Sequence, residues 1–400
     1  MADVRPFRAL RPRNDLASDI IALPYDVLTE SEARALAVHP MSFLHVTRSE
    51  VDLAPGTDPH SDRAYAKARE NLDAFEAHGW LQQDDAPTYY LYGQKMGDHV
   101  QVGVIAACSV EEYNDGRIAR HEFTRPDKED DRTHHMDVLD AQVGLVFLTY
   151  RSEQPLDGLL DELAQAEPAW KVQTEDDVEH TFWVVPSDRV DALREAFANV
   201  PKLYVADGHH RSAAASRIHG QRGDETSAYF LAGVFPSDRL HVMAYNRVVH
   251  DLHGHEPQAL LDAIRERFEV SEGPSVPEHR GAYSMFLDGT WYRLLPKTVP
   301  DDPVGRLDAS VLQDQLLQPL LGIDDPRRSK RITFVGGIHG PDRVAELTTQ
   351  HQGVGFHLFP TGLEQLFDVA DAGEVMPPKS TWFEPKLRGG VTVRKLSERA

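Results

Sequence analysis

The chain has 400 residues, of which 41% are hydrophobic, so it is long enough to bury a core in one large or two ordinary domains. Its 64 acidic and 42 basic residues give a net charge of −22, and such a surface repels nucleic-acid phosphates. The single cysteine, Cys108, excludes a disulfide framework and lies in an apolar run, where we interpret it as a core residue. No apolar stretch has the length of a membrane span, and the N-terminus lacks a signal-peptide pattern. We therefore expect a cytoplasmic protein with neither a nucleic-acid nor a membrane partner.

Hydrophobic periodicity predicts mixed α and β structure along the whole chain. Residues 62–79 have the pattern of an amphipathic helix, and 89–92 and 100–107 are expected to form a hairpin around a turn at 93–99. Further helices are expected at 157–166, 187–199, 257–268, 307–321, 341–350 and 361–370; further strands at 143–150, 181–185, 203–206, 240–249, 331–335 and 354–358; and a hairpin at 283–295. One internal domain boundary is expected in a stretch rich in proline, glycine and acidic residues, either 251–256 or 271–281.

A charged segment, residues 118–135, is the first candidate for chemistry. Pro126 is predicted to open a helix there. Glu122 lies just before that helix, and a carboxylate at such a junction can act as a general base or help to hold a magnesium ion. The alternative, which composition alone favours, is a solvated charged helix with ordinary ion pairs. The neighbours of Glu122 that we take as candidate substrate-binding residues are His121, Thr124 and Arg132.

The second candidate is a strand-to-helix turn. The apolar residues 203–206 lead into Asp207 and Gly208, and an alanine-rich helix is predicted to begin on His209 and to stop at Gly220. The N–H groups at the start of a helix, together with the positive end of its dipole, form an anion site.

Two residues of this turn suit a phosphate ligand. Gly208 lets a ligand approach the backbone, and Arg211 adds a planar group that can bind two phosphate oxygens at once. The alternative is an ordinary polar strand-to-helix turn without a ligand. The candidate nucleotide-binding residues are Gly208, His209, His210 and Arg211.

The third candidate is the proline-rich segment 376–390. Its lysines, Lys379 and Lys386, bring positive charge, and Ser380 and Thr381 offer hydroxyl groups. A loop stiffened by proline suits a ligand clamp, because it has little conformational entropy left to lose on binding. The alternative is a strap whose aromatic residues pack onto the body of the protein, and the two interpretations are compatible.

At these places the chain resembles an uncharacterised bacterial family classed as a domain of unknown function. That family is similar to the ParB/sulfiredoxin-like superfamily, whose members bind nucleotides at a helix N-terminus, and within it to the free-serine kinases. Those kinases have Pro-His-Glu where this chain has Arg120-His121-Glu122, and Pro-Lys-Thr-Thr where it has Pro378-Lys379-Ser380-Thr381. The matching segments are 24–27, 121–124, 131–132, 207–211 and 378–386.

The resemblance implies an α/β (mixed α+β) fold with a ParB/sulfiredoxin-like nucleotide-binding core and large insertions. Residues 1–250 would hold this core with an N-terminal elaboration. Residues 251–400 would form a C-terminal α/β domain, whose segment 376–390 returns to the site.

The resemblance also implies a kinase that phosphorylates free L-serine, or a similar small hydroxylated metabolite, with ATP or ADP and Mg²⁺. Glu122 would be the catalytic base, and Asp207 would orient the hydroxyl or share the magnesium ion. Lys379, Ser380 and Thr381 would close over phosphate or carboxylate.

Two other functions stay open. The first is a nucleotide-binding regulatory protein without small-molecule turnover. The second is a metal-dependent hydrolase, but the spacing of its candidate ligands fits no standard pattern, so the sequence assigns no metal-ligating residue. Those candidate ligands are His121, Glu122, His134, His135, Asp207 and His209.

Overall fold

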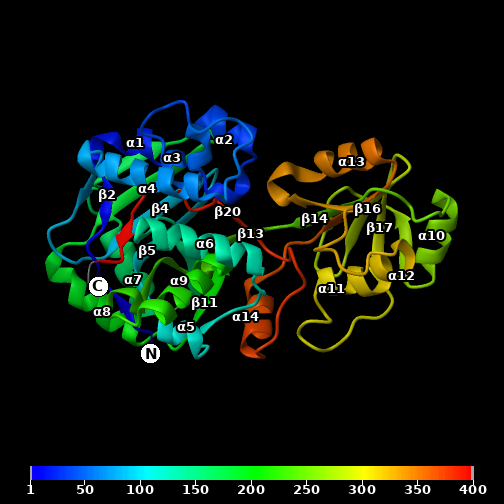
Figure 1. Cartoon of the computed structure of the whole chain (residues 1–400). Coiled ribbons are helices and arrows are strands. Elements are labelled where there is room, and N and C mark those ends of the chain that lie inside the picture. Colours follow the sequence, from blue (N-terminus) through cyan, green and yellow to red (C-terminus); the bar gives the residue numbers. More distant parts are fainter. Residues whose placement is uncertain (1, 153, 398–400) are drawn as a thin grey trace. The chain divides into compact units, whose positions relative to one another are not determined.

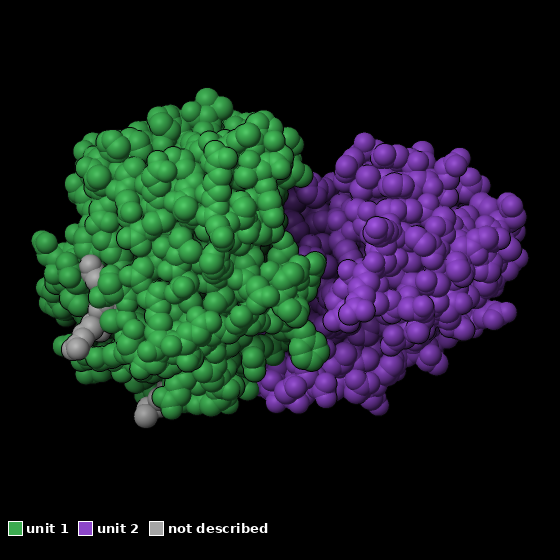
Figure 2. Space-filling view, in the orientation of Figure 1, with its two compact units in different colours: residues 1–240, 385–400 green, residues 241–384 purple. Residues whose placement is uncertain are grey.

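The computed structural model describes residues 2–152 and 154–397. The chain forms two compact units (Figure 2): residues 1–240 together with 385–400, and residues 241–384. The chain thus leaves the first unit after Leu240 and returns to it at Pro385. Both units combine helices with sheets, and the predicted mixed α/β fold class is confirmed (Figure 1). Among the described residues, no helix is both long and apolar enough to cross a membrane.

A nine-stranded mixed sheet forms the centre of the first unit. Its order is β6 (Ile118–Ala119), β11 (Leu203–Asp207), β8 (Val146–Tyr150), β12 (Tyr229–Pro236), β5 (His99–Ser109), β4 (Tyr90–Met96), β10 (Val178–Val184) and β9 (Trp170–Gln173), with β1 (Val4–Arg5) also paired to β5. Strand β11 runs parallel to β6 and antiparallel to β8. Its four apolar residues are buried, which is why an unbroken apolar run marks it in the sequence.

Helices pack against this sheet and against one another. The longer ones are α4 (Asp62–Ala77), α6 (Pro126–Leu139), α7 (Gln154–Leu163), α8 (Val190–Ala198) and α9 (His209–Arg222). Helix α6 contacts both α4 and α9 (Figure 1). Shorter elements complete the unit: α1 (Ala17–Ile20), α2 (Glu30–Leu36), α3 (Leu44–Thr47), α5 (Val110–Asn114), and the strand pairs β2 (Leu10–Pro12) with β3 (Leu81–Gln83) and β7 (Ala141–Gln142) with β21 (Arg394–Lys395).

The second unit is built on a six-stranded antiparallel sheet. Its order is β15 (Phe268–Glu272), β17 (Thr290–Pro296), β16 (Tyr283–Leu287), β19 (Val354–Leu358), β14 (Tyr245–Val249) and β18 (Ile332–Gly336). Its helices are α10 (Pro257–Arg265), α11 (Asp308–Leu312), α12 (Gln318–Leu321), α13 (Gly340–His351) and α14 (Leu363–Asp371). The two ends of the unit pair as a ribbon of β13 (His241–Met243) and β20 (Trp382–Glu384).

One predicted turn and one predicted helix end are wrong, and the structure shows why in each case. The hairpin turn is Gly97-Asp98 rather than 93–99, because Gly93 lies inside β4, where a Cβ atom would come within 3.0 Å of the Trp183 ring on β10. Helix α9 does not stop at Gly220. It continues to Arg222 and ends at Gly223, whose φ of +65° ends the helix with a left-handed residue.

The two glycines near the end of α9 provide a stability test. No atom lies within 4 Å of a Cβ atom built at either position. Gly220→Ala is expected to raise the free energy of unfolding by about 0.5–1 kcal/mol, because alanine favours a helix interior. Gly223→Ala is expected to lower it by about 1–2 kcal/mol, because an L-residue is strained in the left-handed region. Urea denaturation of the two variants checks this, and equal effects would contradict the observed helix end.

Candidate functional site

The candidate site begins where strand β11 meets helix α9. Gly208 is the N-cap of α9 in a left-handed conformation, with φ of +88°, and no side chain caps the helix. A Cβ atom on Gly208 would lie 3.4 Å from the Cα of Val146 on the neighbouring strand. The backbone N–H of Gly208 donates to Oδ1 of Asp207 at 2.8 Å. The helix therefore starts in a tight, uncapped turn, which confirms the local structure predicted from the sequence.

Asp207 is held by a lysine from the returning segment. The Nζ of Lys386 donates to Oδ2 of Asp207 at 2.9 Å, although the two residues are 179 positions apart. Desolvation alone would raise the pKa of Asp207, but the charge and hydrogen bond of Lys386, with the charge of Arg211, hold it well below its usual value. Asp207 is therefore ionised at neutral pH, and the ammonium group of Lys386 is hydrogen-bonded to its carboxylate.

Arg211 lies in the first turn of α9, and its side chain packs against Gly144. A Cβ atom on Gly144 would lie 3.1 Å from the Nε of Arg211, so a larger residue at this position would displace the arginine side chain slightly. The guanidinium donates to the carbonyl oxygen of Leu145 at 2.7 Å and lies 4.0 Å from the carboxylate of Asp26. Its central carbon is 5.3 Å from the ring centre of Tyr25. These contacts fix the side chain in one orientation.

A pocket in the first unit extends from Arg211 to Arg132 on α6. Both guanidiniums face the ring of Tyr25, and the central carbon of Arg132 lies 4.0 Å from the ring centre. Arg132 also pairs with Asp131 at 2.7 Å and is largely buried. The pocket therefore combines apolar walls with fixed positive charge; it is lined by Pro24, Met136, Val143, Leu145, Phe230 and Leu387 together with Tyr25 and the arginines.

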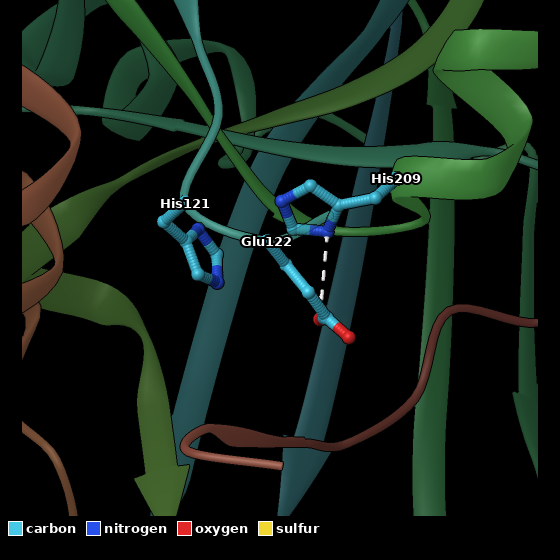
Figure 3. A group of neighbouring side chains, drawn as sticks. All are labelled: His121, Glu122 and His209. Carbon is cyan, nitrogen blue, oxygen red and sulfur yellow. Dashed lines mark ion pairs between the residues drawn. The ribbon is translucent and has the colours of Figure 1, made fainter. Parts of the chain in front are cut away.

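A second group of side chains meets at the start of α9. His121 and Glu122 follow strand β6, and their side chains approach His209 (Figure 3). The Nδ1 of His209 lies 4.0 Å from Oε2 of Glu122, and the two imidazole rings are 4.5 Å apart, edge to face. His121 is 2% exposed and His209 is 4% exposed. The parallel pairing of β6 with β11 brings these two sequence segments together.

Both histidines of this group are neutral at physiological pH. Burial lowers the pKa of His121 to about 4, although a hydrogen bond with the backbone of Val205 works in the other direction. Burial also lowers the pKa of His209 far below its ordinary value, and His121 adds to this effect. The carboxylate of Glu122 thus lies next to two neutral imidazoles.

Two further predicted residues have structural partners. The hydroxyl of Thr124 donates to Oε2 of Glu129 at 2.8 Å. The Nε2 of His210 accepts a hydrogen bond from the backbone N–H of Arg125 at 3.0 Å. Both contacts join the Glu122 loop to the helices α6 and α9, so these residues position the loop.

The predicted residues of segment 379–381 belong to the second unit. The carbonyl oxygen of Lys379 accepts from Arg247 at 3.3 Å, and its Nζ lies 5.4 Å from the ring centre of Tyr245. Ser380 donates to the carbonyl of Pro377 at 2.7 Å, and Thr381 is half-buried. Their part in a site with Asp207 stays a prediction.

His134 and His135 lie apart from the Glu122 group. His134 approaches Asp62 at 3.8 Å and the ring of Tyr65, and His135 contacts the carbonyl oxygen of Val46 at 3.2 Å. Of the six residues considered for a hydrolase, the structure therefore brings together His121, Glu122 and His209.

The sequence alone does not single out Lys386 or Tyr25 as site residues. Lys386 is one of two lysines in a proline-rich segment, and nothing in that pattern indicates which lysine contacts Asp207. Tyr25 follows Pro24 in a segment that only the family resemblance marks. The conformation that places the Tyr25 ring beside two arginines depends on contacts distant in sequence.

Residues 4–310 match a family described as "Protein of unknown function (DUF1015)". The chain belongs to this family. A search of curated proteins found no match. The relation of the family to the ParB/sulfiredoxin-like superfamily stays a prediction.

Solved structures with similar folds include a mutant free serine kinase in complex with AMP, which is 12% identical, with a TM-score of 0.38 over 72% of this chain and 92% of the other. A conserved hypothetical protein from Pyrococcus furiosus is 13% identical, with a TM-score of 0.38 over 74% and 96%. SbnI with a C-terminal truncation, from Staphylococcus aureus, is 11% identical, with a TM-score of 0.41 over 74% and 90%.

The Lys386–Asp207 contact predicts a shift in one carboxyl pKa. Lys386→Met is expected to raise the pKa of Asp207 toward its ordinary value of 3.8, because the cation that favours the ionised form is lost. A depressed carboxyl pKa stabilises the fold above its ordinary value, and this stability is lost as the pH falls through the folded-state value. Lys386→Met is therefore expected to lower stability at pH 7, by an amount that shrinks in acid.

NMR titration of ¹³C-labelled aspartate measures this pKa directly. Lys395→Met is the matched control, because Lys395 lies on the same returning segment but pairs with Glu76. An unchanged Asp207 pKa in Lys386→Met would show that the contact does not form.

Proposed function

We propose that this protein is a cytoplasmic, nucleotide-dependent kinase that phosphorylates the hydroxyl group of free L-serine or of a similar small metabolite. One observation supports the proposal above all: the N-terminus of α9 is uncapped, and the carboxylate of Glu122 lies beside it. Gly208 and Arg211 offer phosphate-binding groups, and Glu122 lies 4.0 Å from His209 in the same turn. Phosphoryl transfer requires phosphate-binding groups and a base for the attacking hydroxyl close to one another.

The residues present fit a nucleotide phosphate chain. An uncapped helix start with Gly208 at its tip lets phosphate oxygens approach backbone N–H groups. Arg211 is already oriented by its contact with Leu145, so little side-chain entropy remains to be lost on binding. The nucleotide supplies the phosphoryl group, and Mg²⁺ on its phosphates neutralises charge. Asp207, ionised and partly exposed, is the carboxylate that can hold that Mg²⁺.

In the proposed reaction, the acceptor oxygen forms a bond to the terminal phosphorus while the bond to the departing nucleotide oxygen breaks. The hydroxyl proton passes to the carboxylate of Glu122 and then to water. Glu122 suits this step because its side chain is 40% exposed and the adjacent imidazole of His209 is neutral. The positive charges of Lys386 and Arg211 would stabilise the negative charge on the transferred phosphoryl group.

Incubating the purified chain with L-serine, Mg²⁺ and either ATP or ADP tests the proposal. Mass spectrometry is expected to show O-phosphoserine and the nucleotide with one phosphate fewer. A panel of other small hydroxylated amino acids extends the search for the acceptor. Tight nucleotide binding without any product would favour the regulatory alternative, and neither binding nor product would overturn both.

Arg211→Ala is expected to weaken nucleotide binding by about 1.5–3 kcal/mol, because a charge-assisted contact with two hydrogen bonds is lost. Arg211→Lys keeps the charge but loses the planar geometry, so we expect an intermediate loss. Isothermal titration calorimetry measures both. Arg217→Ala, which removes a partner of Asp130 farther along the same helix, is the control and is expected to leave the affinity unchanged. Equal affinity in Arg211→Ala would remove Arg211 from the site.

Glu122→Gln is expected to lower the turnover number by about 10²–10⁴-fold while nucleotide affinity is kept, because the amide has the same shape but cannot accept the proton. Steady-state kinetics and calorimetry on the same preparation separate these effects. Full turnover in Glu122→Gln would mean that another group takes the proton.

A further inference from the structure

We propose that His121, Glu122 and His209 bind a divalent transition-metal ion, separate from any Mg²⁺ that accompanies a nucleotide. Each of the three residues offers one ligand atom, and these atoms lie within 4.8 Å of one another. The three side chains converge from two segments, the loop after β6 and the first turn of α9 (Figure 3).

Two buried nitrogen atoms of this group lack partners. The Nδ1 of His121 is inaccessible to solvent and has no hydrogen-bond partner among the described residues. The Nε2 of His209 is also unpartnered among these residues, whereas the nitrogen of His209 that lies 4.0 Å from Glu122 is Nδ1. A buried polar atom without a partner costs about 1–3 kcal/mol, so a fold keeps such atoms where something else binds them. The ring of His121 is also oriented by the backbone of Val205, as metal-ligating imidazoles are commonly oriented by a backbone carbonyl.

The ligand set distinguishes the class of ion. Magnesium prefers oxygen ligands and keeps several waters, whereas two imidazoles and one carboxylate suit zinc, manganese, iron or cobalt. The single carboxylate leaves a bound divalent ion with a net positive charge, which favours an additional anionic or hydroxyl ligand.

The spacing of the three groups permits an ion after a small movement. Ligand bonds of about 2.1 Å in tetrahedral geometry separate the ligand atoms by about 3.4 Å. The Nδ1 of His209 and the Oε2 of Glu122 are 4.0 Å apart. The side chain of Glu122 is 40% exposed, so it can move toward the buried imidazoles and leave the solvent side of the ion open.

An ion at this place goes beyond the proposed transfer reaction, and it does not depend on that reaction. With one carboxylate oxygen of Glu122 on the ion, the other oxygen can still accept a proton. A hydroxyl group bound to such an ion has a lowered pKa, so an acceptor alcohol placed there would lose its proton more readily.

Metal binding by the untagged full chain, stripped with a chelator and free of nucleotide, tests the proposal. Isothermal titration with Zn²⁺ and Mn²⁺ is expected to show one site per chain. Cobalt added to the stripped chain is expected to give the visible absorption of an ion with nitrogen ligands and fewer than six ligands. Because no nucleotide or acceptor is present, this result is independent of kinase activity.

Variants assign the ion to this group. His209→Ala and Glu122→Gln are each expected to weaken binding at least about 10-fold and to change the cobalt spectrum. His134→Ala is the control, because His134 lies on α6 outside the group. Glu122→Gln changes a half-exposed side chain, so it tests the site even if the buried histidine variant fails to fold. Absence of a stoichiometric site, or one unchanged in Glu122→Gln, would overturn the proposal.

Discussion

The ion pair between Lys386 and Asp207 sets the electrostatics of the whole candidate site. Asp207 lies at the tip of β11, one residue before the N-cap of α9, where a bare carboxylate would repel a phosphate. Lys386 neutralises that charge at 2.9 Å, and Arg211 in the first turn of α9 adds a second cation whose charge acts on the same carboxylate. The protein as a whole carries a net charge of −22, so the nucleotide phosphates that we propose to bind at the helix end would depend on these local cations.

The histidines of the site do not contribute to that positive field. Burial keeps His121 and His209 neutral, although an Asp-Gly-His-His-Arg sequence suggests a row of cations. The turn therefore divides into two chemical parts. Lysine and arginine supply charge on one side, and neutral imidazoles with the Glu122 carboxylate supply lone pairs on the other.

The parts of the site that depend on local sequence could be predicted, and those that depend on distant contacts could not. The end of β11 and the start of α9 follow from an apolar run, a glycine and an alanine-rich stretch, and the structure has them at the expected residues. The sequence could not show that α9 ends at Gly223 rather than at Gly220. Both glycines suit a helix end, and the left-handed backbone conformation that ends the helix is visible only in the structure. That Lys386 is the partner of Asp207 could not be predicted, because the two residues are 179 positions apart and no local sequence pattern indicates the contact.

The way in which the chain leaves and re-enters the first unit has a consequence for biosynthesis. His241 pairs with Glu384, so the two connections to the second unit run side by side, and Lys386 follows only two residues after that pairing. During translation, strand β11 and helix α9 emerge from the ribosome long before their lysine does. Asp207 therefore lacks its lysine partner until residues 241–384 have been synthesised. The ion pair between Asp207 and Lys386 can therefore form only after the second unit has been synthesised.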